Sequence, residues 1–192
     1  LRCLVGSEMC IRDRMRVLVT GGAGFIGSHT VVELQNCGHD VVVVDNYSNS
    51  SPDVLERVQR ITGKQVKAYA GDIQNGSLLE KIFQTHTIDA VIHFAGLKSV
   101  GESVTIPLKY YRNNIDATLS LLETMDRFSC HKLVFSSSAT VYGPNNPVPY
   151  QEDMPTSATN PYGWTKVMIE QMLRDVAASS PNWSIVSLRY FN

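Results

Sequence analysis

The sequence lacks an excess of charge of either sign. Its 192 residues carry 17 Lys and Arg against 18 Asp and Glu, a formal net charge of −1. Without a basic surplus to neutralise phosphates, we expect no nucleic-acid partner. Hydrophobic residues make up 43% of the chain, which is enough apolar surface for a folded core. At roughly 150 residues per domain, this length predicts one complete domain and a modest remainder.

Long apolar runs and cysteine patterns are also missing. No stretch of about 20 apolar residues is present, so we predict no membrane span. The four cysteines, Cys3, Cys10, Cys37 and Cys130, form no C-x-x-C pair, and no Cys/His cluster has zinc-site spacing. We therefore expect no metal and a reducing, cytoplasmic location. Cys37 and Cys130 are expected to be packing or surface thiols, and His93 a core histidine.

The first fourteen residues show no sustained hydrophobic period. They also lack the apolar core of about 7–15 residues that a signal peptide requires. We interpret residues 1–14 as an extension, disordered or non-native, and residues 15–192 as the folded domain.

From Met15 onward, short β-branched runs alternate with longer stretches of helical period. Strands are predicted over 16–20, 40–45, 66–70, 90–94, 132–136 and 184–188, and helices over 25–36, around 54–61 and 78–83, and over 107–128 and 161–179. The run DVVVVD at 40–45 is typical of a strand buried on both faces of a parallel sheet. This alternation predicts an α/β fold with a doubly wound parallel sheet.

A glycine-rich segment, TGGAGFIG at residues 20–27, separates the first predicted strand from the first helix and contains G-x-G-x-x-G. Glycine there permits a tight turn and the close approach of a pyrophosphate. The free amides at the helix start, those of Phe25 and Ile26 foremost, can hold the phosphate charge. The motif alone is weak evidence, but its place between strand and helix, with Asp45 18 residues beyond Gly27, predicts a dinucleotide site.

Two aspartates close the second and third predicted strands. Asp45 can accept hydrogen bonds from a ribose diol and would repel a 2′-phosphate, which favours NAD over NADP. Asp72 can meet an adenine amino group. Either residue can instead cap the structure that follows it, Asp45 the next loop and Asp72 the next helix.

Tyr162 and Lys166 lie four residues apart, so a helix opened by Asn160 and Pro161 places them on one face. The pKa of a phenol, near 10, must fall by ~3, or ~4 kcal/mol, before it is a base near neutrality. A nearby ammonium and a positively charged nicotinamide favour the phenolate. Such a pair on an ordinary helix is a packed tyrosine and a solvated lysine. The upstream dinucleotide motif and the serine run at 136–138 favour the catalytic interpretation.

Long segments of the sequence resemble the extended short-chain dehydrogenase/reductase family, in particular its nucleotide-sugar epimerases. The match runs from Met15 to the end and includes MRVLVTGG at 15–22, VIHFAGLKSVGES at 91–103, SSSATVYG at 136–143 and LRYFN at 188–192. These segments are more specific than the glycine loop alone. The resemblance implies a Rossmann domain whose C-terminal substrate lobe is missing from this chain.

Carried over by position, the resemblance implies three sets of site residues. The catalytic residues would be Ser138, Tyr162 and Lys166. The NAD-binding residues would be Gly21, Gly24, Phe25, Ile26, Gly27, Asp45, Asn46, Tyr47, Ser48, Asn49, Ser50, Asp72, Ile73, Phe94, Ala95, Gly96, Leu97, Lys98, Asn113, Ser138, Tyr162, Lys166 and Phe191. A UDP-sugar would contact Lys98, Ser138, Tyr162 and Asn192. The family often has Lys-Ser where Trp164 and Thr165 stand, and we expect these to project away from the Tyr/Lys face with little effect.

The resemblance further implies an activity, the interconversion of UDP-glucose and UDP-galactose in galactose metabolism. Tyr162 would take the proton of the sugar 4-hydroxyl while hydride moves from C4 to NAD⁺, and the 4-keto sugar would turn and accept the hydride on its other face. Lys166 would lower the tyrosine pKa and hold the nicotinamide ribose. The full-length protein is expected to be a homodimer.

Two other functions stay open at this point, and a third is disfavoured. A nucleotide-sugar dehydratase would carry an Asp-Glu pair where Ala139 and Thr140 stand, which argues against elimination. An epimerase of UDP-N-acetylhexosamine or UDP-uronate uses the same chemistry. A chain without the substrate lobe could also be a non-catalytic NAD-binding module, weak or inactive by itself.

Overall fold

The computed structural model describes residues 14–191, so the predicted extension falls almost wholly outside the described residues. The fold is built on one six-stranded sheet in the order β3-β2-β1-β4-β5-β6, and each pair of neighbouring strands is parallel. The strands are β1 (Arg16–Thr20), β2 (Asp40–Asp45), β3 (Lys67–Ala70), β4 (Ala90–His93), β5 (Lys132–Ser138) and β6 (Ser184–Tyr190). The predicted doubly wound parallel sheet is confirmed.

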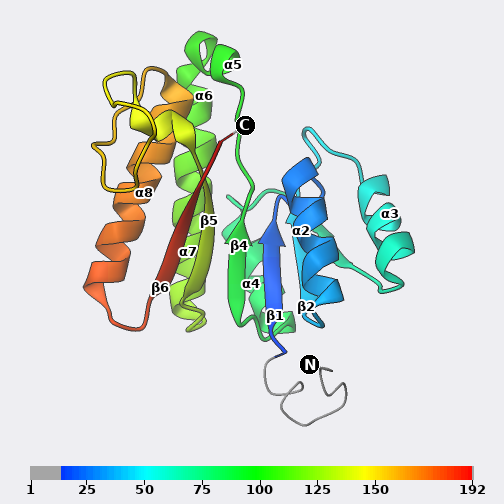
Figure 1. The fold of residues 1–192 in the computed structure, drawn as a ribbon. Helices are drawn as coiled ribbons and strands as arrows, with labels where there is room; N and C mark the ends of the chain where they lie inside the picture. The colour runs from blue at the N-terminus through cyan, green and yellow to red at the C-terminus, as the bar shows by residue number, and fades with distance from the viewer. Residues whose placement is uncertain (1–13, 192) are drawn as a thin grey trace, which may run out of the picture.

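Helices connect successive strands and cover the sheet. They are α2 (Phe25–Asn36), α3 (Asp53–Thr62), α4 (Gly76–Thr85), α5 (Val100–Thr105), α6 (Pro107–Tyr111), the π-helix η1 (Arg112–Asp116), α7 (Ala117–Arg127), the 3₁₀-helix η2 (Ala139–Tyr142) and α8 (Pro161–Ser179). Figure 1 shows α2 in front of the sheet, α3 beside it at the right, and α4 and α7 behind it. Leu55 and Val58 of α3 pack in the same cluster as Val31 of α2. A parallel sheet covered in this way needs apolar side chains on both faces.

The two-residue period of the strands divides the core into two clusters. On β1, Val17 and Val19 pack with Val31 of α2, whereas Leu18 between them packs on the opposite side with Leu121 of α7. β2 alternates in the same way, which explains its nearly unbroken apolar run. The larger cluster also contains Ile169 and Leu173 of α8, so this helix is anchored on the face that carries α4 and α7.

The segment predicted as one helix over 107–128 is divided in the structure. The π-helix η1 interrupts it between α6 and α7, and the short helix α5, which no periodic pattern indicated, precedes it. A π-helical turn widens the helix locally and leaves the hydrophobic period of the α-helices on either side intact. Periodicity alone therefore does not detect it. Strands β5 and β6 each extend two residues beyond the predicted end, and their added residues pair with each other through Ser137–Arg189 and Ser138–Tyr190.

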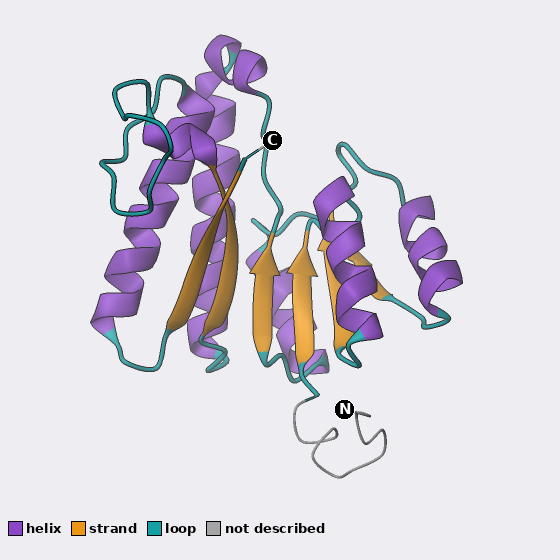
Figure 2. Ribbon diagram, in the orientation of Figure 1, coloured by secondary structure: helices purple, strands orange, loops and turns teal. Residues whose placement is uncertain are grey.

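The carboxyl ends of all six strands lie at one edge of the sheet, where the loops to the helices gather (Figure 2). The strand order reverses between β1 and β4, which is where open α/β sheets bind ligands. Within residues 14–191, no helix is long and apolar enough to cross a membrane.

Candidate active site

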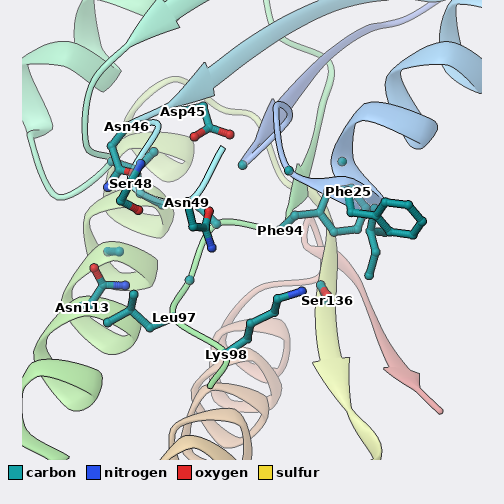
Figure 3. Close-up of a pocket in the computed structure, with 18 of the residues that line it drawn as sticks. Phe25, Asp45, Asn46, Ser48, Asn49, Phe94, Leu97, Lys98, Asn113 and Ser136 are labelled. Atoms are coloured by element: carbon teal, nitrogen blue, oxygen red, sulfur yellow. The ribbon is translucent and has the colours of Figure 1, made fainter. Parts of the chain in front are cut away.

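A cleft of about 300 Å³ opens at the carboxyl edge of the sheet, across the reversal between β1 and β4. Every residue of the predicted NAD-binding set lines it except Tyr47, Ser50 and Phe191. Figure 3 shows Asp45 and Asn46 toward one side, and Lys98 reaching across toward Ser136. The structure therefore brings the glycine loop and the Ser/Tyr/Lys residues, which are more than 100 residues apart in sequence, to one cavity.

The glycine loop is packed too tightly for side chains. Gly21 has φ +68°, and a Cβ there would lie 2.7 Å from the backbone nitrogen of Ala95. A Cβ on Gly27 would overlap the carbonyl oxygen of Gly21. Within the described chain, no side chain caps α2, and its first turn carries no acidic residue. The helix therefore presents free amides and the positive end of its dipole to the cleft, which suits a phosphate group.

Asp45 is buried where β2 meets the glycine loop. One carboxylate oxygen accepts a hydrogen bond from the amide of Ala23 at 2.9 Å, and the other accepts from the amide of Tyr47 and the hydroxyl of Ser50. Asp45 therefore does cap the loop that follows β2, as the alternative interpretation predicted. A carboxylate offers about four acceptor positions, so one remains for a ribose hydroxyl. The ribose role stays a prediction.

Asp72 also caps its own turn. Its carboxylate accepts from the amide of Gln74 and from the side-chain amide of Asn46, both at 2.9 Å. The cap of α4 itself is Asn75, whose side chain accepts from the amide of Leu78. Asp72 therefore ties the loops after β2 and β3 together at the cleft.

The Ser/Tyr/Lys trio meets at the end of β5. Asn160 caps α8 by accepting from the amide of Gly163, and Pro161 is the first helical residue, as predicted. On the inner face of this helix, the Lys166 Nζ donates to the carbonyl of Ser136 at 2.8 Å and lies 5.9 Å from the centre of the Tyr162 ring. Tyr162, Lys166 and Ser138 all line the cleft.

Ser138 is oriented by its own turn. Its Oγ accepts from the amide of Thr140 at 3.2 Å and from the Thr140 hydroxyl at 3.1 Å. Both contacts use the oxygen as acceptor, so the hydroxyl proton of Ser138 is free to donate into the cleft.

Burial dominates the ionisation of the pair. It raises the pKa of Tyr162, an effect opposed by a hydrogen bond with Ser138. It lowers the pKa of Lys166 to about 8, an effect opposed by the charge of Glu170. The protein residues alone therefore do not lower the tyrosine pKa as expected, because desolvation outweighs the hydrogen bond with Ser138. A competent phenolate needs further positive charge in the cleft.

A buried hydrogen-bond network supports this region. Asn114 on η1 accepts from the amide of Leu97 at 2.8 Å and donates to the Leu97 carbonyl and to the Thr165 hydroxyl. Thr165 in turn donates to the carbonyl of Tyr162 at 2.7 Å. Thr165 was predicted to project away from the Tyr/Lys face with little effect, but its hydroxyl is part of this network. Thr165 is fully buried because it faces η1, and it joins the cleft loop to α8.

Three residues of the predicted cofactor set lie outside the cleft for identifiable reasons. Tyr47 has φ +54° and packs against the cluster under α2 and α3. Ser50 turns its hydroxyl to Asp45. Phe191 packs against Tyr142 and Tyr150, with ring centres 6.0 Å apart in each case. Asn192, the predicted substrate contact, lies outside the described residues.

Sequence reasoning missed several residues that line the cleft: Val44, Gly71, Ala117, Ser136, Ser137 and Tyr190. Each is adjacent in sequence to a strand end or a helix start. The predicted strand ends supplied a signal for most of them, since the carboxyl ends of parallel strands converge.

His93 is a core histidine, as predicted. It is 1% exposed, and its ring nitrogens lie 2.7 Å from the Thr20 Oγ1 and 3.1 Å from the Thr118 Oγ1. Burial, with a smaller effect of the Lys166 charge, lowers its pKa to about 3. The neutral ring connects β1, β4 and α7 behind the cleft.

We predict that this histidine makes stability depend on pH. The unfolded chain takes up the proton near pH 6.5 and the folded chain only near pH 3, so stability declines as pH falls between these values. The slope from one such group reaches about 1.4 kcal/mol per pH unit. The pKa of His86 is also lowered, mainly by burial, so His86 adds to the loss of stability at low pH.

Urea unfolding at pH 7 and pH 5 measures how steeply the stability depends on pH. The slope should become shallower in His93→Gln but not in His29→Gln, and equal slopes would contradict the assignment.

The fold and the cleft define a class: a doubly wound dinucleotide-binding domain with a Ser/Tyr/Lys site at the sheet edge. Comparison with known proteins gives the particular family. The model of the NAD dependent epimerase/dehydratase family matches residues 17–192, and the chain belongs to this family.

Individual relatives are similar over the same region. The UDP-glucose 4-epimerase of Dictyostelium discoideum is 58% identical over 177 residues, which cover 92% of this chain and 52% of that protein. The enzyme of the same name from Bacillus subtilis is 56% identical over 178 residues, again 52% of its length. The structure of UDP-glucose 4-epimerase from Bifidobacterium longum in complex with NAD⁺ and UDP superposes with a TM-score of 0.91 at 57% identity, covering 92% of this chain and 53% of that one. The chain thus spans about half the length of the relatives it matches.

Proposed function

We propose that this chain is the NAD-binding part of a UDP-glucose 4-epimerase, an isomerase that interconverts UDP-glucose and UDP-galactose in galactose metabolism. The observation that carries the proposal is the placement of Tyr162, Lys166 and Ser138 in the same cleft as the glycine loop. Relatives with this activity at more than half sequence identity support it. In this proposal, residues 15–192 form the cofactor domain, and the sugar nucleotide is held partly by a lobe that this chain does not include.

NAD fits the residues present. The glycine positions leave a space that a Cβ would fill, and the amides at the start of α2 face it. Asp45, with one acceptor position free and a negative charge, suits a ribose diol and opposes a 2′-phosphate, so we propose NAD rather than NADP. Asn113 and the segment 94–98 would line the rest of the cofactor.

When bound, NAD⁺ would supply the hydride acceptor and donor that interconversion at sugar C4 requires. Tyr162 takes the 4-hydroxyl proton and later gives it back. The Ser138 hydroxyl, held by Thr140, donates to the oxygen that gains charge as the proton leaves. Lys166 adds positive charge one helical turn from Tyr162, and the buried phenol would need the further positive charge that a bound nicotinamide carries.

The proposal is tested by turnover of UDP-galactose, followed by coupling UDP-glucose formation to its oxidation. We expect turnover by the protein at the full length of its relatives, and little or none by the 192-residue chain alone. Titration with NAD should show binding to both. No turnover by the longer protein would refute the proposed activity, and robust turnover by the short chain would refute the fragment interpretation. UDP-N-acetylglucosamine and UDP-glucuronate, assayed in parallel, separate the related epimerases from this one.

We also propose a cytoplasmic location and a homodimer of the full-length protein. The location is supported by Cys37 and Cys130, which are both free thiols as expected in a reducing compartment. The homodimer is an expectation from the family resemblance, and light scattering of the full-length protein measures it.

A further inference from the structure

A buried carboxylate lies two helical turns below Tyr162, on the same face of α8. Glu170 follows Lys166 by four residues, and its side chain is only 3% exposed. Isolated burial of a carboxylate is very costly, so such a group persists only where it is paired and hydrogen-bonded. The proposed reaction assigns Glu170 no role.

Glu170 is paired completely. Arg189 of β6 approaches it with two parallel contacts, Nε to Oε1 at 3.0 Å and Nη2 to Oε2 at 2.7 Å. The Ser137 hydroxyl donates to Oε1 at 2.5 Å, and Arg174 donates to Oε2 from a half-exposed position. A bidentate pair of this kind fixes orientation as well as distance.

The contacts of Glu170 reach both sides of Ser138. On the near side, Lys166 holds the carbonyl of Ser136 while Glu170 holds the hydroxyl of Ser137, so two successive turns of α8 bind two successive residues of β5. On the far side, Arg189 donates to the Tyr142 hydroxyl at 2.8 Å and to the Glu152 carbonyl at 3.1 Å. The ion pair therefore fastens the segment that begins at Ser138 to the helix that carries Tyr162.

Glu170 also supplies the charge opposite Lys166. The titratable groups near the Lys166 ammonium are Tyr162 and Glu170 on α8, with Arg189 paired to Glu170, and His93 on β4. The same cleft is also lined by Lys98, Tyr190, Asp45 and Asp72. His93 is held neutral by burial, and Glu102 and Lys109 of the neighbouring helices α5 and α6 pair with each other. Among these described groups, Glu170 is the carboxylate whose charge favours the ammonium.

We propose that Glu170 is a positioning residue for the reaction, held by Arg189 and Ser137 so that it aligns Ser138 with the Tyr162–Lys166 pair and keeps Lys166 protonated. The inference rests on the proposed function, because it assumes Tyr162 acts as the base. It adds to that function a residue that acts indirectly, because Glu170 affects the charge of Lys166 without contacting the substrate.

The test is the pH profile of kcat in Glu170→Gln, measured with full-length protein. Loss of the anion makes Lys166 lose its proton more readily, so the phenolate loses support and the acidic limb moves to higher pH. Loss of the Glu170 charge also acts directly on Tyr162, where it lowers the pKa of the phenol. This effect is smaller, because Tyr162 lies two helical turns from Glu170 and Lys166 only one. We expect the limb to move by about one pH unit, with kcat near neutrality about tenfold lower and KM little changed. Asp175→Asn removes an exposed carboxylate from the same helix and should leave the profile unchanged.

A double variant separates the effect of Glu170 on the active site from its effect on folding stability. Glu170→Gln leaves Arg189 unpaired and lowers stability, whereas Glu170→Gln with Arg189→Gln gives a neutral pair that can still hydrogen-bond. If Glu170 merely holds the fold, the double variant recovers both melting temperature and pH profile, and the proposal is overturned. If the melting temperature recovers while the limb stays displaced, the proposal is supported. An unchanged limb in a folded Glu170→Gln protein also overturns it.

A readout without turnover keeps this test independent of the proposed function. NMR titration of ¹³C-labelled lysine, with the Lys166 signal identified by its loss in Lys166→Arg, reports the protonation of that amine directly. We expect the midpoint to be lower in Glu170→Gln than in the wild type, and less lowered in the double variant, because that variant also loses the positive charge of Arg189. An unchanged midpoint in Glu170→Gln contradicts the role of Glu170. If the midpoint is lowered in Glu170→Gln but the wild-type protein turns over no UDP-galactose, only the proposed function is contradicted.

Discussion

Replacement of Tyr162 with Phe is expected to lower turnover of UDP-galactose by a factor of about 10²–10⁴, the range that a positioned acid–base group contributes. The variant removes one hydroxyl and keeps the ring, which is 9% exposed and packed at the start of α8. NAD binding and the melting temperature should therefore remain close to those of the wild type. The measurement is kcat from the coupled assay, with the NAD dissociation constant and the melting temperature of the same preparation.

A matched control is Tyr69→Phe. This change also removes a partly buried phenol that has a hydrogen-bond partner, the ring nitrogen of His86 at 2.8 Å, but on β3 at the far edge of the sheet. Its turnover should stay within a few-fold of the wild type. If Tyr162→Phe behaves like Tyr69→Phe, Tyr162 is not the base, and the placement of Ser138 and the buried Lys166 beside it would need another explanation.

The sheet could be predicted from sequence because each of its strands carries a strong local signal. The run at 40–45 is apolar at every interior position, and β2 occupies that range in the structure. The cap of α8 was predictable for the same reason, since Asn160 and Pro161 encode the helix start within two residues. Local signals of this kind survive folding because tertiary packing reinforces them.

The supports of the site could not be predicted in this way. Asn114 is buried because η1 turns it toward Leu97 and Thr165, and a π-turn has no sequence period. A glutamate in a helical pattern is expected to face solvent. Glu170 is buried instead because β6 places Arg189, 19 residues later in the sequence, against its carboxylate. Polar residues in a helical pattern are assigned to the surface by default, so a buried ion pair is visible only once both elements are placed.

The residues that line the cleft could be predicted only in part. Phe25, Asp45 and Tyr162 could each be assigned to it, because the strand ends and the helix starts define where ligands bind in such a sheet. Phe191 was assigned to the cleft by the family resemblance, but its ring packs instead against Tyr142 at the end of η2 and Tyr150 in the loop before α8. Which side of a strand end faces the ligand depends on neighbours that sequence spacing does not specify.

Replacement of Gly27 with Ala is expected to cost about 3 kcal/mol of folding stability, at the upper end of ordinary overpacking. In a domain of this size 1 kcal/mol lowers the melting temperature by about 2–4 °C, so the expected loss is roughly 6–12 °C. A Cβ at Gly27 would overlap the Gly21 carbonyl oxygen and lie 2.9 Å from the Gly22 Cα. All of these are backbone atoms, which cannot rotate away as the end of a side chain can.

Gly76→Ala provides the matched comparison, because the same methyl group is added at the first residue of α4 with nothing within 4 Å. It should leave the melting temperature unchanged or raise it slightly, since alanine is preferred to glycine in helices by up to about 1 kcal/mol. NAD affinity should fall at least tenfold in Gly27→Ala and stay constant in Gly76→Ala. The reason is geometric: relief of the overlap moves α2 away from the loop, and the amides of Phe25 and Ile26 move with it. If both alanine variants have the same melting temperature and NAD affinity, the close approach of α2 to the glycine loop is not what builds the phosphate site.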